Sequence, residues 1–258
     1  MSAHPTSAIV LAGGLGTRLR SAVPDLPKPM APVAGRPFLA HLMDHWIGQG
    51  IRHFVLSVGY RHEAISGHFG DRYRGAVLEY AVETTPLGTG GGLLQAARHL
   101  SGHAPFLLLN GDTYFDVPLA RLVETAERHR ADGCFALFRT REPGRYMGLA
   151  LADDGRITHL QAGLDAPERL ANGGVYLVQP RALQGLPGPD LLASTPISLE
   201  NDLFPQLLAQ GQRWFGLECP GTFIDIGIPH DFHRAATVLP ASSATQPDDA
   251  HARTLVHY

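Results

Sequence analysis

The sequence predicts an α/β protein with a Rossmann-like, mostly parallel mixed sheet flanked by helices and a smaller mixed-sheet lobe. In the first half of the chain, apolar segments bounded by turn residues alternate with segments of helical period. This alternation is typical of parallel strands whose connecting helices cover both faces of the sheet. In the second half the strand signals are short and closely spaced, which favours an added lobe of mixed strand direction.

Five apolar segments of the first half are expected to form buried strands: 8–12, 53–58, 77–82, 105–110 and 134–138. The helices expected between them cover 37–50, 61–69, 89–99 and 119–130. The first of these begins with Pro37, which suits a first helical turn, and its apolar residues recur on one side. Further strands are expected near 147–151, 156–160, 174–178 and 213–217, with one helix around 200–210.

Composition and charge exclude several classes of protein. The chain has 258 residues, 44% of them hydrophobic, which is enough for a substantial core. A formal net charge of -3 gives no global field that would attract a nucleic acid or a membrane surface. No apolar run reaches the roughly 18 residues of a membrane span. The only cysteines are Cys134 and Cys219, which we expect to be buried free thiols in a cytoplasmic protein.

Three unusual loops each follow a predicted strand. GGLGTR (13–18) follows the first strand, ETTPLGTGGG (83–92) the third and NGD (110–112) the fourth. Ligands of an open parallel sheet bind outside the carboxyl ends of its strands. All three loops should therefore gather at one edge of the sheet and form a ligand site there.

The first loop has the residue types that bind phosphate. Its glycines let the backbone approach a ligand and point N–H groups at phosphate oxygens: Gly13, Gly14 and Gly16. Arg18 adds a forked cation suited to pyrophosphate, and Lys28, between two prolines, adds a point charge. A tight strand-to-helix connection is the alternative. The spacing fits neither the dinucleotide pattern G-x-G-x-x-G nor a Walker loop.

Two aspartates end apolar segments beside a glycine. Asp112 follows Gly111, and Asp225 lies within FIDIG (223–227). A carboxylate among apolar residues is costly unless it is paired or bound to a cation. Two such groups near a phosphate site suggest Mg²⁺, which prefers a few carboxylates together with substrate oxygens. The alternative is that each aspartate caps a turn.

Four motifs together resemble the sugar-1-phosphate nucleotidyltransferases: LAGGLGTRL…PKPM, PLGTGG, NGD and FIDIGIP. They occur in the right order between residue 8 and about residue 236. Within that family, LRSAVPDLPKPMAPVAGRPFL and VLSVGYRHEAI resemble the branch of D-glycero-α-D-manno-heptose 1-phosphate guanylyltransferases.

The resemblance implies a fold organisation and a reaction. It implies one nucleotidyltransferase domain over 1–240, with a nucleotide lobe over about 1–140 and a sugar lobe over most of 141–222. A metal-binding strand at 223–227 would return to the active site, and the polar, aperiodic segment 241–258 is expected to be a poorly ordered tail. An oxygen of a sugar 1-phosphate would attack the α-phosphate of a nucleotide, with pyrophosphate as the leaving group.

The resemblance also assigns roles to individual residues. The catalytic residues would be Arg18, Lys28 and Asp112, with a metal ion held by Asp112 and Asp225. The nucleotide would contact Leu11, Ala12, Gly13, Gly14, Gly16, Thr17, Glu83, Pro86, Gly88, Thr89 and Gly111. The sugar would contact Asn110, Gly148, Asn172, Gly173, Arg169 and Glu200.

Glu83 bears on the choice of base. Relatives that transfer uridylyl or thymidylyl groups tend to have glutamine at this place. Guanine offers two adjacent donors that one carboxylate can accept together, whereas uracil and thymine offer one donor flanked by carbonyls. Glu83 therefore favours GTP. The alternative is a solvated loop charge.

One departure from the family pattern concerns the sugar phosphate. Relatives usually have Glu-Lys where this chain has Gln161-Ala162, and that lysine holds the sugar phosphate. Either another cation substitutes, with Arg169 and Arg145 as the candidates, or activity is reduced.

These observations predict a cytoplasmic, Mg²⁺-dependent guanylyltransferase that makes GDP-D-glycero-α-D-manno-heptose for surface polysaccharide. Its partners would be GTP and a sugar 1-phosphate, with no nucleic acid and no membrane; the oligomeric state is left open, a homodimer included. One alternative is a mannose- or glucose-1-phosphate nucleotidyltransferase. Another is a non-catalytic paralogue that binds sugar nucleotides and regulates an enzyme.

Overall fold

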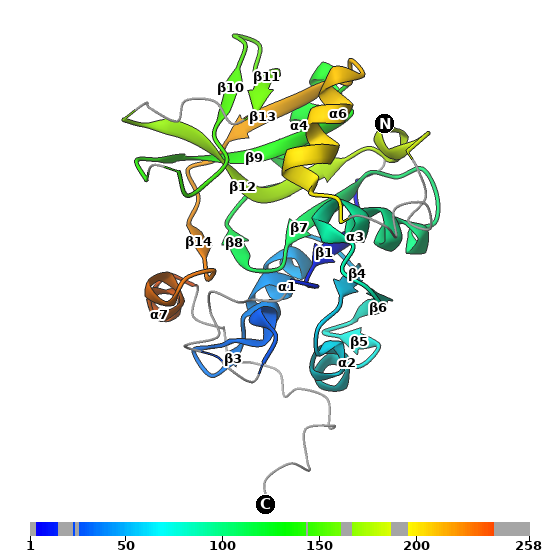
Figure 1. Cartoon of the computed structure of the whole chain (residues 1–258), viewed down its shortest axis with the longest axis vertical. Coiled ribbons are helices and arrows are strands. Elements are labelled where there is room, and N and C mark those ends of the chain that lie inside the picture. The colour runs from blue at the N-terminus through cyan, green and yellow to red at the C-terminus, as the bar shows by residue number, and fades with distance from the viewer. Residues whose placement is uncertain are drawn as a thin grey trace, which may run out of the picture.

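The computed structural model describes residues 4–14, 23, 26–142, 144–160, 167–186 and 196–239 (Figure 1). Its central sheet has eight strands in the order β13-β9-β12-β7-β1-β4-β6-β5. Their bounds are β1 (Ser7–Leu11), β4 (His53–Val58), β5 (Arg72–Tyr73), β6 (Ala76–Val82), β7 (Phe106–Asn110), β9 (Gly133–Thr140), β12 (Arg169–Val178) and β13 (Trp214–Glu218).

Three small antiparallel sheets and several helices surround the central sheet. The small sheets pair β2 (Pro32–Val33) with β3 (Arg36–Pro37), β8 (Thr113–Phe115) with β14 (Phe223–Asp225), and β10 (Leu149–Leu151) with β11 (Ile157–Leu160). The α-helices are α1 (Phe38–Gly48), α2 (His62–Phe69), α3 (Gly88–Ala96), α4 (Leu119–His129), α6 (Phe204–Ala209) and α7 (Pro229–Val238). Shorter turns are η2 (Lys28–Met30), η3 (Ala97–His99), η4 (Pro180–Leu183) and the π-helical η5 (Leu199–Leu203).

Strand β1 lies between two parallel neighbours. Leu11 is opposite Ser57 of β4 on one side and Asn110 of β7 on the other. The chain passes from β1 to β4 and β6, and then crosses to β7 on the opposite side of β1. This reversal of strand order creates the crevice in which open parallel sheets bind ligands.

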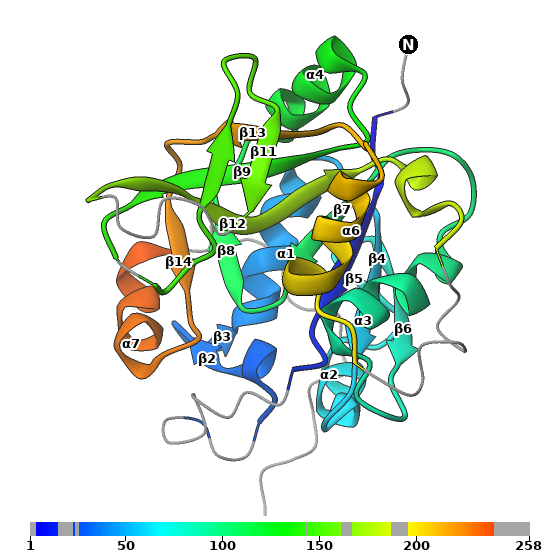
Figure 2. The same ribbon diagram turned by 45° about the horizontal axis from the view of Figure 1, so that its top comes forward.

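The mostly parallel, mixed sheet is confirmed. β4 and β6 are parallel, as are β9 and β13, whereas β12 runs antiparallel to both β7 and β9. β12 and β13, expected in the smaller lobe, continue the central sheet, and β10 and β11 form a separate hairpin (Figure 2).

Helices cover both faces of the sheet. Ala8 and Val10 of β1 share one core with apolar residues of α1, α2 and α4. Ile9 points the other way, into a core with α3, η5 and α6. The period of two along β1 therefore separates the two layers. Cys134 and Cys219 are buried, as expected, and burial raises the pKa of the Cys134 thiol to about 12.

Several elements differ from the sequence-based expectation. β12 begins at Arg169 rather than 174, because its NGG segment is a strand irregularity with Gly174 at φ +71 rather than a turn. The structure adds β2, β3, β5, β8 and α7, which the apolar pattern did not predict. α7 closes a third core with Ile224 and Ile226, beside the segment that carries Asp225. No helix in the described part of the chain could span a membrane.

Candidate active site

A cavity of about 490 Å³ opens where the carboxyl ends of β1, β6 and β7 meet. Most of the expected site residues that the structure describes line it: Leu11, Ala12, Gly13, Gly14, Lys28, Glu83, Pro86, Gly88, Thr89, Asn110, Gly111, Asp112 and Glu200. Gly16, Thr17 and Arg18 lie outside the described residues, as do Gln161 and Ala162 and the tail 241–258. The structure therefore brings the described parts of the three loops together at one edge, as the sequence predicts.

The glycines of the cavity have two different functions. Gly111 and Gly88 permit close packing of the protein itself, because a Cβ atom would lie 2.6 Å from the Leu11 carbonyl oxygen and 2.4 Å from the Ile197 carbonyl oxygen, respectively. At Gly14 nothing lies within 4 Å of the Cβ position. Gly14 therefore leaves its backbone accessible to a ligand in the cavity.

The pairing of β8 with β14 places two carboxylates side by side. Asp225 is opposite Thr113, and the Ile226 N–H donates to the Asp112 carbonyl oxygen at 3.0 Å. Lys28 Nζ forms an ion pair with the Asp112 carboxylate. Burial, and then the charge of Asp112, raise the pKa of Asp225, while Lys28 and the Gly227 N–H (2.6 Å from Asp225 Oδ1) oppose the rise.

This donor set fits a hard divalent cation. Within the described residues no third His, Cys, Asp or Glu completes a protein cage with these carboxylates. Magnesium needs no such cage, since it is usually held by one or two carboxylates, waters and substrate phosphates. Asp112, which lines the cavity, and its neighbour Asp225 match that requirement.

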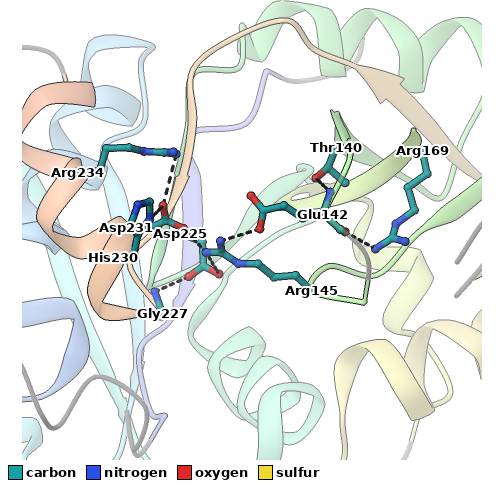
Figure 3. Close-up of polar contacts among 9 residues, drawn as sticks. All are labelled: Thr140, Glu142, Arg145, Arg169, Asp225, Gly227, His230, Asp231 and Arg234. Carbon is teal, nitrogen blue, oxygen red and sulfur yellow. Dashed lines mark hydrogen bonds and ion pairs between the residues drawn. The ribbon is translucent and has the colours of Figure 1, made fainter. Parts of the chain in front are cut away.

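Arg145 joins this carboxylate pair to α7. Figure 3 shows its guanidinium directed toward Asp225 and Asp231. Arg145 forms an ion pair with Asp231, lies 3.7 Å from Asp225 Oδ2, and donates to Glu142 Oε2 at 2.9 Å. Burial alone would lower the pKa of Arg145, but the hydrogen bonds to Asp231 and Glu142 raise it well above its ordinary value.

Arg169 supports the loop that carries Arg145. Its buried Nη2 donates to the carbonyl oxygens of Glu142 at 2.9 Å and Tyr146 at 3.4 Å (Figure 3). Five expected site residues are not among the described residues that line the cavity: Gly148, Arg169, Asn172, Gly173 and Asp225. Gly173 instead packs against Phe115, where a Cβ atom would lie 2.4 Å from the ring.

The buried Asn172 forms a polar cluster with the partly buried Glu200, which lines the cavity. Asn172 Nδ2 donates to Glu200 Oε1 at 2.9 Å and to the Tyr176 hydroxyl at 2.7 Å. Burial, and to a lesser extent the charge of Asp112, raise the pKa of Glu200. Glu200 belongs to η5, and such π-helical turns are frequent at functional sites.

Sequence reasoning missed several residues of the site. Ser57 and Ser198 line the cavity, and Asp231 holds Arg145. The signal for Ser57 was a single polar residue near the carboxyl end of an apolar strand, HFVLSV. Ser198 accepts the Asn201 N–H, as the cap residue of a helical turn does. Asp231 had no signal, because its partner is 86 residues away.

The family model for nucleotidyl transferases matches residues 7–242. D-glycero-alpha-D-manno-heptose 1-phosphate guanylyltransferase of Aneurinibacillus thermoaerophilus is 38% identical over 232 residues, which cover 90% of this chain and 97% of that protein. Mannose-1-phosphate guanylyltransferase of Mycobacterium tuberculosis is 33% identical over 250 residues, which cover 96% of this chain and 68% of that protein. The crystal structure of HddC from Yersinia pseudotuberculosis complexed with GMP-PN matches with a TM-score of 0.77 and 28% identity. The match covers 90% of this chain and 98% of HddC.

Asp231 is expected to stabilise the protein through its charge. Burial alone would raise its pKa, but Arg145 outweighs burial and lowers it. An aspartate with a lowered pKa stabilises the fold above its unfolded pKa of about 3.9 and loses that contribution as the pH falls through the folded value. Asp231→Asn should therefore reduce the free energy of unfolding by roughly 3 kcal/mol at pH 7, and by less below about pH 4.

Urea unfolding of both proteins between pH 7 and pH 3.5 measures this difference. Asp153→Asn, on an exposed hairpin turn, is the control and should match the parent throughout. A loss that is the same at every pH would mean that Asp231 contributes by packing rather than by charge.

Proposed function

The chain belongs to the nucleotidyl transferase family, and we propose from this premise that it transfers GMP from GTP to D-glycero-α-D-manno-heptose 1-phosphate. Pyrophosphate is released and GDP-heptose is formed, as a precursor for surface polysaccharide. The observation that carries the proposal is one cavity lined by both a carboxylate suited to guanine, Glu83, and the ion pair of Lys28 and Asp112. Asp225 lies close enough to this pair for the charge of Asp112 to raise its pKa. The full-length similarity to a heptose 1-phosphate guanylyltransferase supports the same substrates.

Glu83 recognises the base in this proposal. One carboxylate accepts N1–H and the 2-amino group of guanine together, which forms a bidentate, charge-assisted pair. Uracil and thymine would place carbonyl oxygens against the same carboxylate, and adenine would place its N1 lone pair there. Each of these arrangements is repulsive, so GTP is preferred.

The phosphates lie between the first loop and Lys28. Backbone N–H groups at Gly13 and Gly14 approach the triphosphate, and Arg18 stabilises the departing pyrophosphate. Lys28 neutralises charge on the α-phosphate and on the attacking sugar phosphate. In-line displacement requires positioning and charge neutralisation rather than a covalent nucleophile. Backbone amides and cationic side chains are the residue types that meet this requirement.

Asp112 and Asp225 would hold Mg²⁺. When bound, the ion supplies additional positive charge to the reacting phosphates and helps to orient them. Lys28, which is paired with Asp112 in this structure, is thereby placed next to the same phosphates.

The sugar lies toward Asn172, Glu200 and Asn110. Glu200 and Asn172 are hydrogen-bonded to each other and can exchange that bond for contacts with sugar hydroxyls. A mannose 1-phosphate substrate is the second candidate, because the mannose-1-phosphate guanylyltransferase of Mycobacterium tuberculosis is 33% identical to this chain. The phosphorylated substrates and the two buried thiols support a cytoplasmic location.

Arg145 replaces the usual sugar-phosphate lysine in this proposal, and Arg169 positions it. The guanidinium of Arg145 lies 3.7 Å from a carboxylate oxygen of Asp225, next to the place where the phosphates meet. The Arg169 guanidinium donates hydrogen bonds to main-chain carbonyl oxygens of the loop that carries Arg145. The geometry therefore favours Arg145 over Arg169 as the cation for the sugar phosphate.

The choice of substrates is tested by a pyrophosphate-release screen of GTP, ATP, UTP and dTTP against heptose, mannose and glucose 1-phosphates. GTP with the heptose phosphate should give the highest kcat/KM. Glu83→Gln should reduce the preference for GTP by roughly one to two decades, because it replaces charge-assisted hydrogen bonds. A parent enzyme that prefers UTP or dTTP would overturn the guanylyltransferase assignment, and a protein that binds nucleotides without turnover would favour the regulatory paralogue.

The metal assignment predicts a strict requirement for Mg²⁺. EDTA should abolish activity, and Asp112→Asn and Asp225→Asn should each raise the Mg²⁺ concentration for half-maximal activity at least about tenfold, since even outer-shell changes have effects of that size. Asp154→Asn, on the exposed hairpin turn, is the control. Activity of the parent protein that survives EDTA would show that the two aspartates serve another purpose.

Arg145→Ala should raise the KM for the sugar 1-phosphate about 10- to 100-fold, as expected for the loss of a charge-assisted contact, while the KM for GTP changes little. Arg145→Lys should recover part of the loss, and Arg234→Ala, which removes a more distant partner of Asp231 (3.6 Å), is the control. Equal increases in both KM values would contradict a role in binding the sugar phosphate.

A further inference from the structure

The carboxylate of Glu83 is held in one orientation by two donors. Ser57 Oγ donates to Oε1 at 3.0 Å, and the Leu87 N–H donates to Oε2 at 3.1 Å. The main chain of Glu83 is fixed as well, because its N–H donates to the Val58 carbonyl oxygen at 2.8 Å. The side chain thus extends from the end of β6 to the neighbouring strand β4, where it contacts Ser57 near the carboxyl end of that strand.

Two glycines surround this carboxylate. A Cβ atom at Gly13 would lie 2.7 Å from Glu83 Oε1, and a Cβ atom at Gly92 would lie 2.9 Å from the same oxygen. The Cβ position of Gly92 is also only 2.7 Å from Ser57 Oγ. A side chain at either glycine would therefore displace the carboxylate or its donor, which gives a reason for a glycine inside helix α3.

Ser57 is fully buried, with 0% exposure. A buried hydroxyl is costly unless it is hydrogen-bonded, and an alanine would fit a strand end without that cost. The hydroxyl donates to a charged oxygen, and hydrogen bonds of this kind are stronger than those between neutral groups. Its position therefore indicates a function tied to Glu83 rather than to the packing of β4.

The Glu83 carboxylate can still accept hydrogen bonds from a ligand in the cavity that it lines. Each carboxylate oxygen can accept more than one hydrogen bond, and each here accepts one from the described part of the chain. Both oxygens therefore remain able to accept from a ligand, with their positions already fixed before it binds. Such preorganisation reduces the conformational entropy that binding would otherwise cost.

We propose that Ser57 and Gly92 are positioning residues for base selection, which fix the Glu83 carboxylate so that it accepts the two donors of guanine and rejects other bases. The inference rests on the proposed guanylyl transfer. Without the serine the carboxylate loses one of its two donors among the described residues and keeps the Leu87 amide, so it can rotate and a base with one donor meets less repulsion. With a side chain at residue 92 the carboxylate moves.

The test compares kcat/KM for GTP and UTP in the parent, Ser57→Ala, Ser57→Cys and Gly92→Ala. Ser57→Ala should reduce the GTP/UTP preference roughly 5- to 20-fold, consistent with the loss of one hydrogen bond to a charged group. Ser57→Cys, whose thiol is a weak donor, should recover part of the preference. Gly92→Ala should reduce the preference by a similar factor while its Tm, measured separately, reports folding.

Two matched controls make the same substitutions elsewhere in the chain. Ser7→Ala removes a strand hydroxyl at the opposite end of the sheet, and Gly67→Ala adds a methyl group in α2, where nothing lies within 4 Å. Both should keep the parent preference. A merely structural role for Ser57 would lower kcat/KM for both nucleotides equally and leave their ratio unchanged, which would overturn the inference.

A double-mutant cycle separates this inference from the proposed function. In a Glu83→Gln background, Ser57→Ala should no longer change the ratio, because the carboxylate that it positions is gone. A parent that prefers GTP together with an unchanged ratio in Ser57→Ala would refute the positioning role alone. A parent that prefers UTP would refute guanylyl transfer, and the positioning role with it.

Discussion

The pairing of β8 with β14 forces two carboxylates together, and much of the surrounding structure offsets the resulting repulsion. Lys28 neutralises Asp112 from η2, and Arg145 approaches Asp225 from the loop before β10. Arg145 is in turn held by Asp231 of α7. Neighbouring like charges are costly without such compensation, and a bound cation would add to it. The site is therefore built for positive charge that arrives with the substrates.

Aromatic packing provides the rigid support behind this charged group. Phe223 of β14 stacks on Phe138 of β9 with ring centroids 3.9 Å apart and planes 17° from parallel. Tyr146, next to Arg145, meets the edge of Phe223 at 5.5 Å, and Phe115 of β8 does the same from the other side. The strand that carries Asp225 is thus fixed to the central sheet by apolar contacts, so its carboxylate does not have to hold it in place.

The central sheet and the edge at which the site lies could be predicted from the sequence. Apolar segments such as β1 and β7 have strong local signals, and the polar residues that follow them must meet once the strands are parallel. This is why Gly13, Glu83 and Asp112 could be predicted to lie together at the edge of the sheet, where they line the cavity. Contacts across long stretches of chain had no such signal. Asp231 pairs with Arg145, which is 86 residues away in the sequence. Arg169 was expected to bind the sugar, but in the fold its guanidinium donates to main-chain carbonyl oxygens.

The ion pair of Arg145 and Asp231 connects the loop before β10 to α7, across 86 residues of sequence. Lys28 and Asp112 leave the ribosome early and can pair as soon as β1 and β7 align, but Asp225 and its support in α7 follow more than a hundred residues later. Contacts of such large sequence separation form late in folding. The cavity depends on late residues as well, because Ser198, Leu199 and Glu200 line it. The cavity and the pair of carboxylates therefore both become complete when the last third of the chain folds onto β1 and β7.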